Sequence, residues 1–477
     1  MRIFVGYFGY FRKRPLIRSI LALFSSAFVG RILGTVYRVA LVRAAGQDAV
    51  GILQLAMPVY RITRSLATLG MPVAIAKVTA ERTELTGKPD LAAYRLGLSI
   101  MLPAAIAAFL LQALFSGFWG TKVLTDSRTE PALVVLAVLL IPVAVSNALR
   151  GAVQGWQRQS YMAAADVSEA LVRIPVVLGL AILLAPYGTA WVAAGVAIGL
   201  IGGELAHMGV LYAGFRRTLT RWNRRNHAPP AGSARLGTGT RTGSTRTHTG
   251  AIAELRAREL LALSLPLMVT GLLNNLMSLV TVAMIPRLLQ SAGLTVMEAT
   301  REYGRLSGMA MPTIYMPMML IFPVTSVALP EITRLAAMPE GRGLPKLYRL
   351  LVRVFLWTAL VVVFLLPFFW YKGHWLAGLL YGDAGVGELI RPLTIALPFT
   401  YLGSVSMAAL YGLGKTAWTM VSSMAGNILR VVVIWCLAGR PEFGIMGVLW
   451  AMVADSILTA VLAGGGLVWL LLFRLRR

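Results

Sequence analysis

Long apolar stretches alternate with short polar segments along almost the whole chain. Twelve of these stretches are long enough to cross a bilayer as helices, which takes about 20 residues each. The predicted spans are 18–42, 51–76, 94–118, 132–154, 160–184, 188–214, 259–287, 306–330, 350–371, 390–412, 416–438 and 445–473. The pattern therefore predicts an all-α polytopic membrane protein with about 12 transmembrane helices.

Glycines and prolines interrupt several of the predicted spans, and basic residues precede the first. The interrupting residues are Pro58, Gly70, Pro72, Pro312, Pro317 and Pro323. They predict bent helices, because proline removes a backbone donor and neighbouring helices can satisfy the freed groups. The first span contains Arg31 and Arg38. It is too long and too charged to be the apolar core of a cleaved signal peptide.

One segment in the middle of the chain breaks the apolar pattern. Residues 216–257 are rich in Arg, Thr and Gly, which is typical of a solvated connector. Its basic side chains can contact anionic lipid headgroups, although a connector with no specific ligand is the simpler interpretation. Six predicted spans lie on each side of it. We therefore expect an N-terminal lobe over 1–215, a cytoplasmic linker over 216–257 and a C-terminal lobe over 258–477.

The two halves of the chain resemble each other at a nearly constant offset. Pro142 and Pro398 are 256 residues apart, as are Gly188 and Gly444, whereas Arg173 and Arg430 are 257 apart. Gly155 with Gly412 and Arg158 with Lys415 also keep the offset of 257. Several matches at one offset indicate an internal duplication. Because six is even, both repeats enter the membrane in the same sense. We expect pseudo-symmetric lobes around a central cavity, related by a rotation near 180° about the membrane normal.

Composition narrows the possible functions. Apolar residues make up 57% of the chain and charged residues 13%, against about 25% charged in soluble domains. The mean hydropathy of +0.72 excludes an ordinary cytosolic enzyme and a disordered chain. The single cysteine, Cys436, cannot form an internal disulfide, and the four histidines are scattered. With no P-loop, HExxH or GxSxG motif, the sequence predicts no enzyme activity, no cofactor and no metal site.

The net charge of +26 raises nucleic acid as a partner, but the distribution of basic residues favours a membrane explanation. If the N-terminus is cytoplasmic and the spans alternate, most Lys and Arg fall in cytoplasmic ends and loops. This matches the positive-inside rule. We therefore expect a multi-pass protein of the bacterial cytoplasmic membrane with both termini in the cytoplasm, and no nucleic-acid partner.

Arginines inside the predicted spans are the strongest candidates for function. They are Arg31, Arg38, Arg61, Arg64, Arg173 and Arg430. An arginine at a lipid-facing helix centre costs about 2.5–3.5 kcal/mol, so several of them require a wet cavity or anionic partners. Arg31 and Arg38 are seven residues apart, and Arg61 and Arg64 are three apart, so each pair shares a helix face. A cavity with surplus arginine is suited to phosphate or carboxylate.

Intramembrane acids are fewer: Asp166, Glu169, Glu204 and Asp455. Glu169 and Arg173 are four residues apart in the orientation that favours an intrahelical ion pair. Asp455 can pair with an arginine of the second lobe. Glu204 is equally suited to carrying a proton or to a structural role. These acids are therefore predicted to be either coupling or structural groups, with cationic charge left over.

Two stretches resemble a known family of transporters. The segment GRILGTVYRVALVRAAGQDAVGILQLAMPVYRITRSLATLGMPVAIAKVTAE (30–81) is similar to the opening of the stage V sporulation protein B family. The segment from ARELLALSLPLMVTGLLNNLMSLVTVAMIPRLLQSAGL to YGRLSGMAMP (257–312) is similar to the start of its second lobe. These polysaccharide-biosynthesis transporters belong to the multidrug/oligosaccharidyl-lipid/polysaccharide exporter superfamily, which includes the lipid II flippases.

The resemblance implies two six-helix lobes, alternating access and a polyprenyl-diphosphate-linked sugar as substrate. Arg31, in GRILG, matches the cavity arginine of lipid II flippases, and Arg61 or Arg64 matches their arginine in span 2. A second span-1 arginine of those flippases falls at Tyr37, beside Arg38. Many relatives have fourteen spans rather than twelve. The two extra helices of lipid II flippases, which form a lipid-tail groove, are missing from the predicted spans.

These observations predict a flippase that moves lipid-linked oligosaccharide, a precursor of cell wall, spore wall or polysaccharide, across the cytoplasmic membrane. The expected partners are the lipid-linked sugar diphosphate, membrane lipids and a coupling ion, H⁺ or Na⁺. A multidrug/cation antiporter of the same fold is the first alternative, but the cationic surplus argues against it. A non-transporting membrane scaffold for wall synthesis, acting through the linker, is the second. A membrane glycosyltransferase would need an acidic metal or catalytic motif that the sequence lacks.

Overall fold

The computed structural model describes residues 15–227, 257–336, 338 and 343–475. The side chains of residues 15–33, among them Arg31, lie outside this description. The first half forms α2 (Pro15–Thr68), α3 (Met71–Thr86), α4 (Ala92–Leu114), α5 (Ser116–Phe118), α6 (Glu130–Gly155), α7 (Gln159–Leu184) and α8 (Thr189–His227). The second half forms α9 (Ala257–Ser291), α10 (Val296–Arg305), α11 (Met311–Tyr315), α12 (Phe322–Ala336), α13 (Leu344–Tyr381), α14 (Val386–Gly412), α15 (Thr416–Leu437) and α16 (Gly444–Leu475). We call α2–α8 the N-lobe and α9–α16 the C-lobe.

The predicted all-α membrane fold is confirmed, with differences at two places. Ten helices of the described residues are long and apolar enough to cross a membrane. The first two predicted spans form one helix, α2, interrupted at Gly46, whose φ of 78° is left-handed and therefore favours glycine. The predicted span 306–330 is not one helix. A π-helical turn (Leu306–Ala310), α11, a 3₁₀ turn (Met316–Leu320) and α12 follow one another there, in the region whose prolines predicted a bend.

The predicted break at Gly70 is also present. Leu69 and Gly70 both have positive φ, 50° and 67°, and separate α2 from α3. A Cβ on Gly70 would lie 2.6 Å from the carbonyl oxygen of Ser264 in α9. The glycine therefore permits both the turn and a close approach between the lobes.

Local backbone geometry supports the internal duplication. Arg158 precedes α7 with φ −88° and ψ 58°, and Lys415 precedes α15 with φ −94° and ψ 51°. Both follow helices that end at the duplicated glycines, α6 at Gly155 and α14 at Gly412. Packing repeats as well, because α8 lies against α6 and α7 as α16 lies against α14 and α15.

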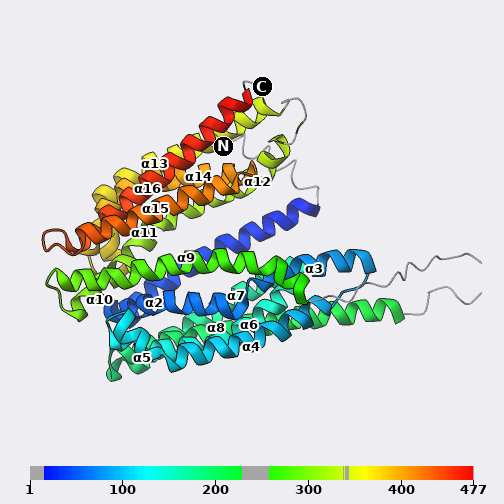
Figure 1. The fold of residues 1–477 in the computed structure, drawn as a ribbon, viewed down its shortest axis with the longest axis horizontal. Helices are drawn as coiled ribbons and strands as arrows, with labels where there is room; N and C mark the ends of the chain where they lie inside the picture. The colour runs from blue at the N-terminus through cyan, green and yellow to red at the C-terminus, as the bar shows by residue number, and fades with distance from the viewer. Residues whose placement is uncertain (1–14, 228–256, 337, 339–342, 476–477) are drawn as a thin grey trace, which may run out of the picture.

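Besides the packing of α9 against α2 and α3, the lobes meet at one end of the molecule, which we call the closed end. It comprises residues 43–51 and 122–130 of the N-lobe with 287–308 and 379–387 of the C-lobe. Figure 1 shows the lobes together at this end, on the left, and the helices α12–α16 diverging from the N-lobe toward the right, while α9 stays beside it. Arg301 forms a bidentate ion pair with Asp48. Its Nε lies 2.8 Å from Oδ1 and its Nη2 lies 3.0 Å from Oδ2. Asp383 accepts hydrogen bonds from Gln47 at 2.8 Å and from Arg305 at 3.1 Å. Charged and polar side chains therefore hold the two lobes together at the closed end.

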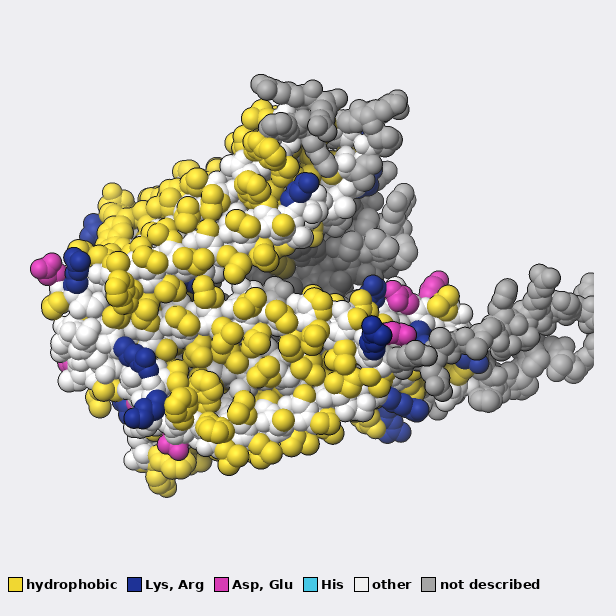
Figure 2. Space-filling view, viewed as in Figure 1, with side chains coloured by type: hydrophobic (Ala, Val, Ile, Leu, Met, Phe, Trp, Pro, Cys, Tyr) yellow, Lys and Arg dark blue, Asp and Glu magenta, His cyan; other side chains and the backbone are white. Residues whose placement is uncertain are grey.

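The distribution of side chains on the surface is typical of a protein that spans a bilayer. Figure 2 shows hydrophobic side chains across the middle of the visible face, with Lys, Arg, Asp and Glu gathered toward its two ends. Large apolar side chains such as Leu114, Phe364 and Trp435 are more than two-thirds exposed. Lipid tails would remove these side chains from water.

The linker prediction needs one correction. The helix α8 continues to His227, so residues 216–227 are helical rather than part of a connector, and α9 begins at Ala257. Arginines spaced along a helix leave the backbone fully hydrogen-bonded, and composition alone did not distinguish this from a solvated linker. Residues 228–256 lie outside the described part of the chain.

Asp126 is buried at the closed end and is hydrogen-bonded to the other lobe, so its replacement should lower the stability of the fold measurably. Its carboxylate, 3% exposed, accepts hydrogen bonds from Arg128 and, at 2.7 Å, from Thr300 of the other lobe. Burial raises the pKa of Asp126, but these hydrogen bonds outweigh it and hold the pKa below its ordinary value. Asp126→Ala should lower the free energy of unfolding in detergent by about 1.5–3 kcal/mol.

The pH dependence of this contribution has a definite sign. Because the folded-state pKa of Asp126 is depressed, its stabilisation is complete above its unfolded pKa, about 3.9, and is lost as the pH falls through the folded value. Thermal unfolding at pH 7 and at about pH 5 should show the same deficit for Asp126→Ala. Glu84→Ala, at an exposed site, is the control. A deficit no larger than that of the control would contradict the assignment.

Candidate functional site

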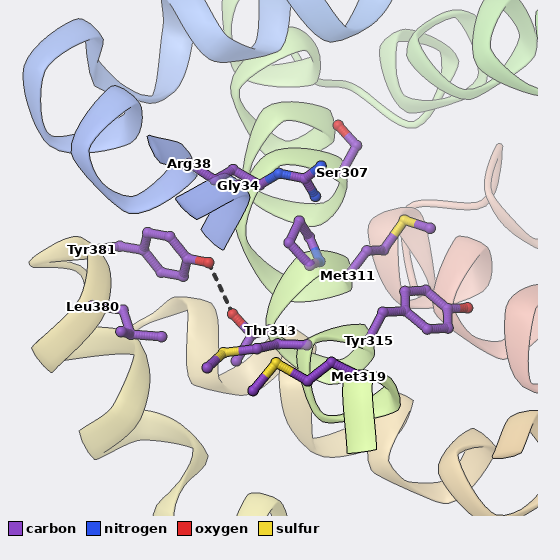
Figure 3. A pocket seen from close by; sticks show the side chains of 11 residues that line it. Gly34, Arg38, Ser307, Met311, Thr313, Tyr315, Met319, Leu380 and Tyr381 are labelled. Carbon is purple, nitrogen blue, oxygen red and sulfur yellow. Dashed lines mark hydrogen bonds between the residues drawn. The ribbon is translucent and has the colours of Figure 1, made fainter. Parts of the chain in front are cut away.

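A cavity between the lobes contains one of the predicted arginines. Its volume is about 470 Å³, within the range of roughly 300–1,000 Å³ for small-molecule sites. Arg38 projects into it from α2, facing Ser307 of the C-lobe (Figure 3). The remaining wall comprises Gly34, Met311, Pro312, Thr313, Tyr315, Met316, Met319, Leu380 and Tyr381. The cavity thus combines a flexible apolar wall, rich in methionine, with a cationic group.

The polar part of this wall is fixed by hydrogen bonds. Tyr381 and Thr313 share a hydrogen bond of 3.0 Å, drawn in Figure 3, and Tyr381 also donates to the carbonyl oxygen of Met309. Arg38 has no ion pair among the described residues and its side chain is exposed. Its charge is therefore available to a ligand.

Arg61 and Arg64 lie on the second half of α2, and both are exposed. The helix α9 approaches them, because Asn275 donates hydrogen bonds to Ser65 at 2.8 Å and to the carbonyl oxygen of Arg61 at 3.3 Å. This part of α2 therefore lies against α9 of the C-lobe. Neither guanidinium forms a salt bridge with a described acid.

The pKa of the Tyr303 phenol is affected by burial and by nearby arginines. This phenol is fully buried at the closed end, and burial raises its pKa to about 12. The charges of Arg61, from the N-lobe, and Arg430, from the C-lobe, both act to lower it.

The two arginines related by the repeat have acid partners. Arg173 Nη1 lies 2.5 Å from Glu169 Oε1, as predicted from their spacing, and its guanidinium lies over the ring of Tyr37, 5.0 Å from the centroid. Arg430 Nη1 lies 3.3 Å from Asp455 Oδ2, so the expected pairing of Asp455 within the second lobe is also present. Each pair cancels most of its own charge, which leaves Arg38, Arg61 and Arg64 as the cationic surplus.

The remaining predicted acids form a separate cluster around His207. Glu204 and His207 lie on α8, Asp166 on α7, and Ser146 and Arg150 on α6. His207 was not predicted as a site residue, because its partners come from three helices. The spacing of Glu204 and His207, three residues apart within a span, was the available signal.

Asp166, Glu169 and His207 also approach one another closely enough to be tested as a metal site. Their ligand atoms lie within 4.8 Å of one another. However, Arg150 Nη1 is 3.4 Å from Asp166 Oδ1 and Arg173 Nη1 is 2.5 Å from Glu169 Oε1. Two guanidinium groups already neutralise the carboxylates that a divalent cation would need, so the donor set does not fit a metal.

Comparisons with known proteins agree on one class of membrane protein. Residues 16–336 match the family model of polysaccharide biosynthesis proteins. Stage V sporulation protein B of Bacillus subtilis is 28% identical over 458 residues, covering 94% of this chain and 83% of that protein. The lipid II flippase MurJ of Bacillus subtilis is 25% identical over 181 residues, covering 35% of this chain and 33% of that protein.

Solved structures show the same fold. An inward-facing multidrug resistance transporter of the MATE family and MOP superfamily superposes with a TM-score of 0.70. The alignment has 15% sequence identity and covers 94% of this chain and 96% of that one. At this identity the comparison establishes the architecture of two helical lobes, and the chemistry has to be argued from the residues of this chain.

Proposed function

We propose that this chain, which belongs to the polysaccharide biosynthesis protein family, is a flippase for polyprenyl-diphosphate-linked oligosaccharide in the bacterial cytoplasmic membrane. The observation that carries the proposal is the set of three exposed arginines of α2, Arg38, Arg61 and Arg64, that have no acid partner among the described residues. Arg38 lines the cavity between the lobes, and Asn275 of α9 bonds the backbone beside Arg61. A diphosphate offers several acceptor oxygens and matches the fork geometry of arginine. Similarity to a lipid II flippase and a sporulation protein supports a wall or polysaccharide precursor as cargo.

The proposed mechanism is alternating access. The diphosphate binds Arg38, Arg61 and Arg64, with Arg31 of the same α2 helix as a fourth contact. Arg173 and Arg430 are paired with Glu169 and Asp455, so they have less charge to offer the diphosphate. The sugar enters the cavity between the lobes while the polyprenyl tail stays in lipid. With both termini in the cytoplasm, the closed end faces outward, and breaking its ion pairs would release the cargo to the outer leaflet.

A multidrug/cation antiporter would need free acids facing the cavity. Glu169 and Asp455 are paired with arginines, and this pairing favours an anionic cargo. A scaffold for wall synthesis would need no surplus arginines in the cavity. Neither alternative accounts for the exposed cations of α2, and no catalytic role is proposed.

The decisive experiment is a flipping assay in proteoliposomes with purified polyprenyl-diphosphate sugars. Labelled lipid placed in one leaflet should reach the other only when the protein is present. The Arg38→Ala protein, inserted normally, is the matched negative variant. A protein that binds wall-synthesis enzymes but moves no lipid would support the scaffold, and export of organic cations alone would support the antiporter.

The Glu169–Arg173 pair provides a separate prediction. If it is structural, the double variant Glu169→Gln with Arg173→Met should keep transport within about two-fold of the original, because both partly buried charges are removed together. Arg173→Met alone leaves Glu169 unpaired and should reduce the amount of folded protein. Initial flipping rates, normalised to membrane expression, measure this. A large loss in the double variant alone would place the pair in the transport mechanism.

A further inference from the structure

A buried imidazole lies between carboxylates in the N-lobe, outside the cavity that Arg38 lines. His207 is 4% exposed. Its Nδ1 lies 2.8 Å from Ser146 Oγ and 3.7 Å from Glu204 Oε1, and its Nε2 lies 3.4 Å from Asp166 Oδ1. Although Nε2 is buried, it makes no hydrogen bond within the described part of the chain. The ring therefore points an unsatisfied nitrogen at a carboxylate.

The surroundings of His207 are close to electrically balanced. The charged groups around the cluster are Arg150 on α6, Asp166, Glu169 and Arg173 on α7, Glu204 on α8 and Arg64 on α2, with the hydroxyls of Ser146 on α6 and Tyr60 on α2 beside them. Arg64 belongs to the cationic surplus assigned to the cargo, so two arginines, Arg150 and Arg173, pair with carboxylates of the cluster and Glu204 is the third carboxylate. With a neutral imidazole the cluster carries a net charge of −1, and one proton on His207 makes it neutral. The cluster thus has two charge states that differ by one proton.

The cluster also has a route to water. The side chain of Asp166 is 51% exposed, whereas that of His207 is 6% exposed. Asp166 therefore lies with one side on the surface of the protein and one oxygen at the buried ring. Proton exchange between solvent and Nε2 needs only a transfer across the 3.4 Å gap between them.

Imidazole is the side chain whose ordinary titration falls nearest to physiological pH, and buried ionisable groups inside membrane spans commonly serve as proton relays. We propose that His207, with Asp166 and Glu204, is a proton-binding site through which an inward proton gradient drives the return of the empty transporter. This inference rests on the proposed flippase activity. The proton binds Nε2 when the cluster is open to the outside and leaves through Asp166 when it is open to the cytoplasm.

The first test does not depend on transport. The chain has only four histidines, so histidine-selective isotope labelling and NMR in nanodiscs can follow each ring. One resonance, absent from His207→Gln, should titrate between about pH 5 and pH 9 and should shift its midpoint in Asp166→Asn. The other three signals in His207→Gln show that the variant folds. A ring that stays in one protonation state over this range would overturn the proposal.

The second test measures coupling. Flipping by the original protein should accelerate when the side of the membrane opposite the donor leaflet is more acidic by one pH unit. The acceleration should reach up to about ten-fold, the ratio of proton activities for one unit. His207→Gln should lose this acceleration. His374→Gln is the matched control, because His374 lies in the C-lobe, where its Nδ1 is 3.1 Å from the carbonyl oxygen of Ala384.

The outcomes separate the two proposals. Flipping that responds to a sodium gradient but not to a proton gradient would overturn the proton site and leave the flippase intact. An equal response to the proton gradient in His207→Gln and in the original protein would also overturn the site. Absence of flipping under every condition, with a normal His207 titration, would instead reject the proposed cargo.

Discussion

Arg61→Ala should weaken binding of a polyprenyl-diphosphate sugar by about 10- to 150-fold. This corresponds to about 1.5–3 kcal/mol for a charged hydrogen bond. The same loss is expected for Arg64→Ala and Arg38→Ala, because these exposed guanidinium groups have no salt bridge to a described acid. Arg31→Ala tests the fourth contact. This expectation follows because the three arginines have no carboxylate partner in the free protein. A guanidinium already paired with a carboxylate would gain less free energy on binding the diphosphate.

Lysine variants separate charge from geometry. Arg61→Lys keeps the positive charge but loses the planar fork, so it should recover only part of the affinity. Binding can be measured by microscale thermophoresis on detergent-solubilised protein that elutes as the original does. Arg353→Ala, at an exposed position of α13, is the matched control and should bind normally. Unchanged affinity in all of the Arg38, Arg61 and Arg64 variants would remove the anion site.

The helices were predictable because each spans an apolar length that only lipid can accommodate. Bends were predictable where a residue imposes them, as at Gly70, where φ is 67°. The region after Leu306 was harder. Its prolines predict a bend, but the combination of a π-helical turn and a 3₁₀ turn depends on how the surrounding helices satisfy the freed backbone groups.

The site was predictable only where its geometry is local. Glu169 and Arg173 lie four residues apart on one helix, so their ion pair follows from helical periodicity. The pairing of Arg430 with Asp455 joins α15 to α16, and sequence offered it only as one possibility. His207 was missed because Ser146, Asp166 and Glu204 meet it from three helices. Which arginines stay unpaired is likewise decided by packing between helices.

A single added side chain at the closed end should keep the two lobes apart. Gly51 of α2 and Gly304 of α10 pack against each other across the lobes. A Cβ on Gly304 would lie 2.7 Å from the carbonyl oxygen of Gln47 and 2.8 Å from Cα of Gly51. A Cβ on Gly51 would likewise clash with the carbonyl oxygen of Thr300. Because these neighbours are backbone atoms, they cannot rotate away.

Gly304→Val should therefore separate the lobes at the closed end and reduce flipping more than ten-fold. Overpacking of this kind costs about 1–3 kcal/mol, enough to shift a two-state equilibrium by about 10- to 150-fold, and it acts only on the state in which the lobes touch. Spin labels at Tyr187→Cys and Glu442→Cys, both exposed, can report the distance between the lobes. The labels require a Cys436→Ser background, since Cys436 is the only cysteine.

Gly209→Val provides the control, because a Cβ at Gly209 meets no atom within 4 Å while the change in helix propensity is the same. In the control the label distance should match that of the original protein. In Gly304→Val it should lengthen, and Gly304→Ala should give a smaller shift in the same direction. If Gly304→Val flips lipid normally with an unchanged distance, contact between the lobes at this end is not part of the transport cycle.

A charge exchange, Asp48→Arg with Arg301→Asp, should by contrast keep the lobes in contact at the closed end, since the ion pair is reversed rather than removed.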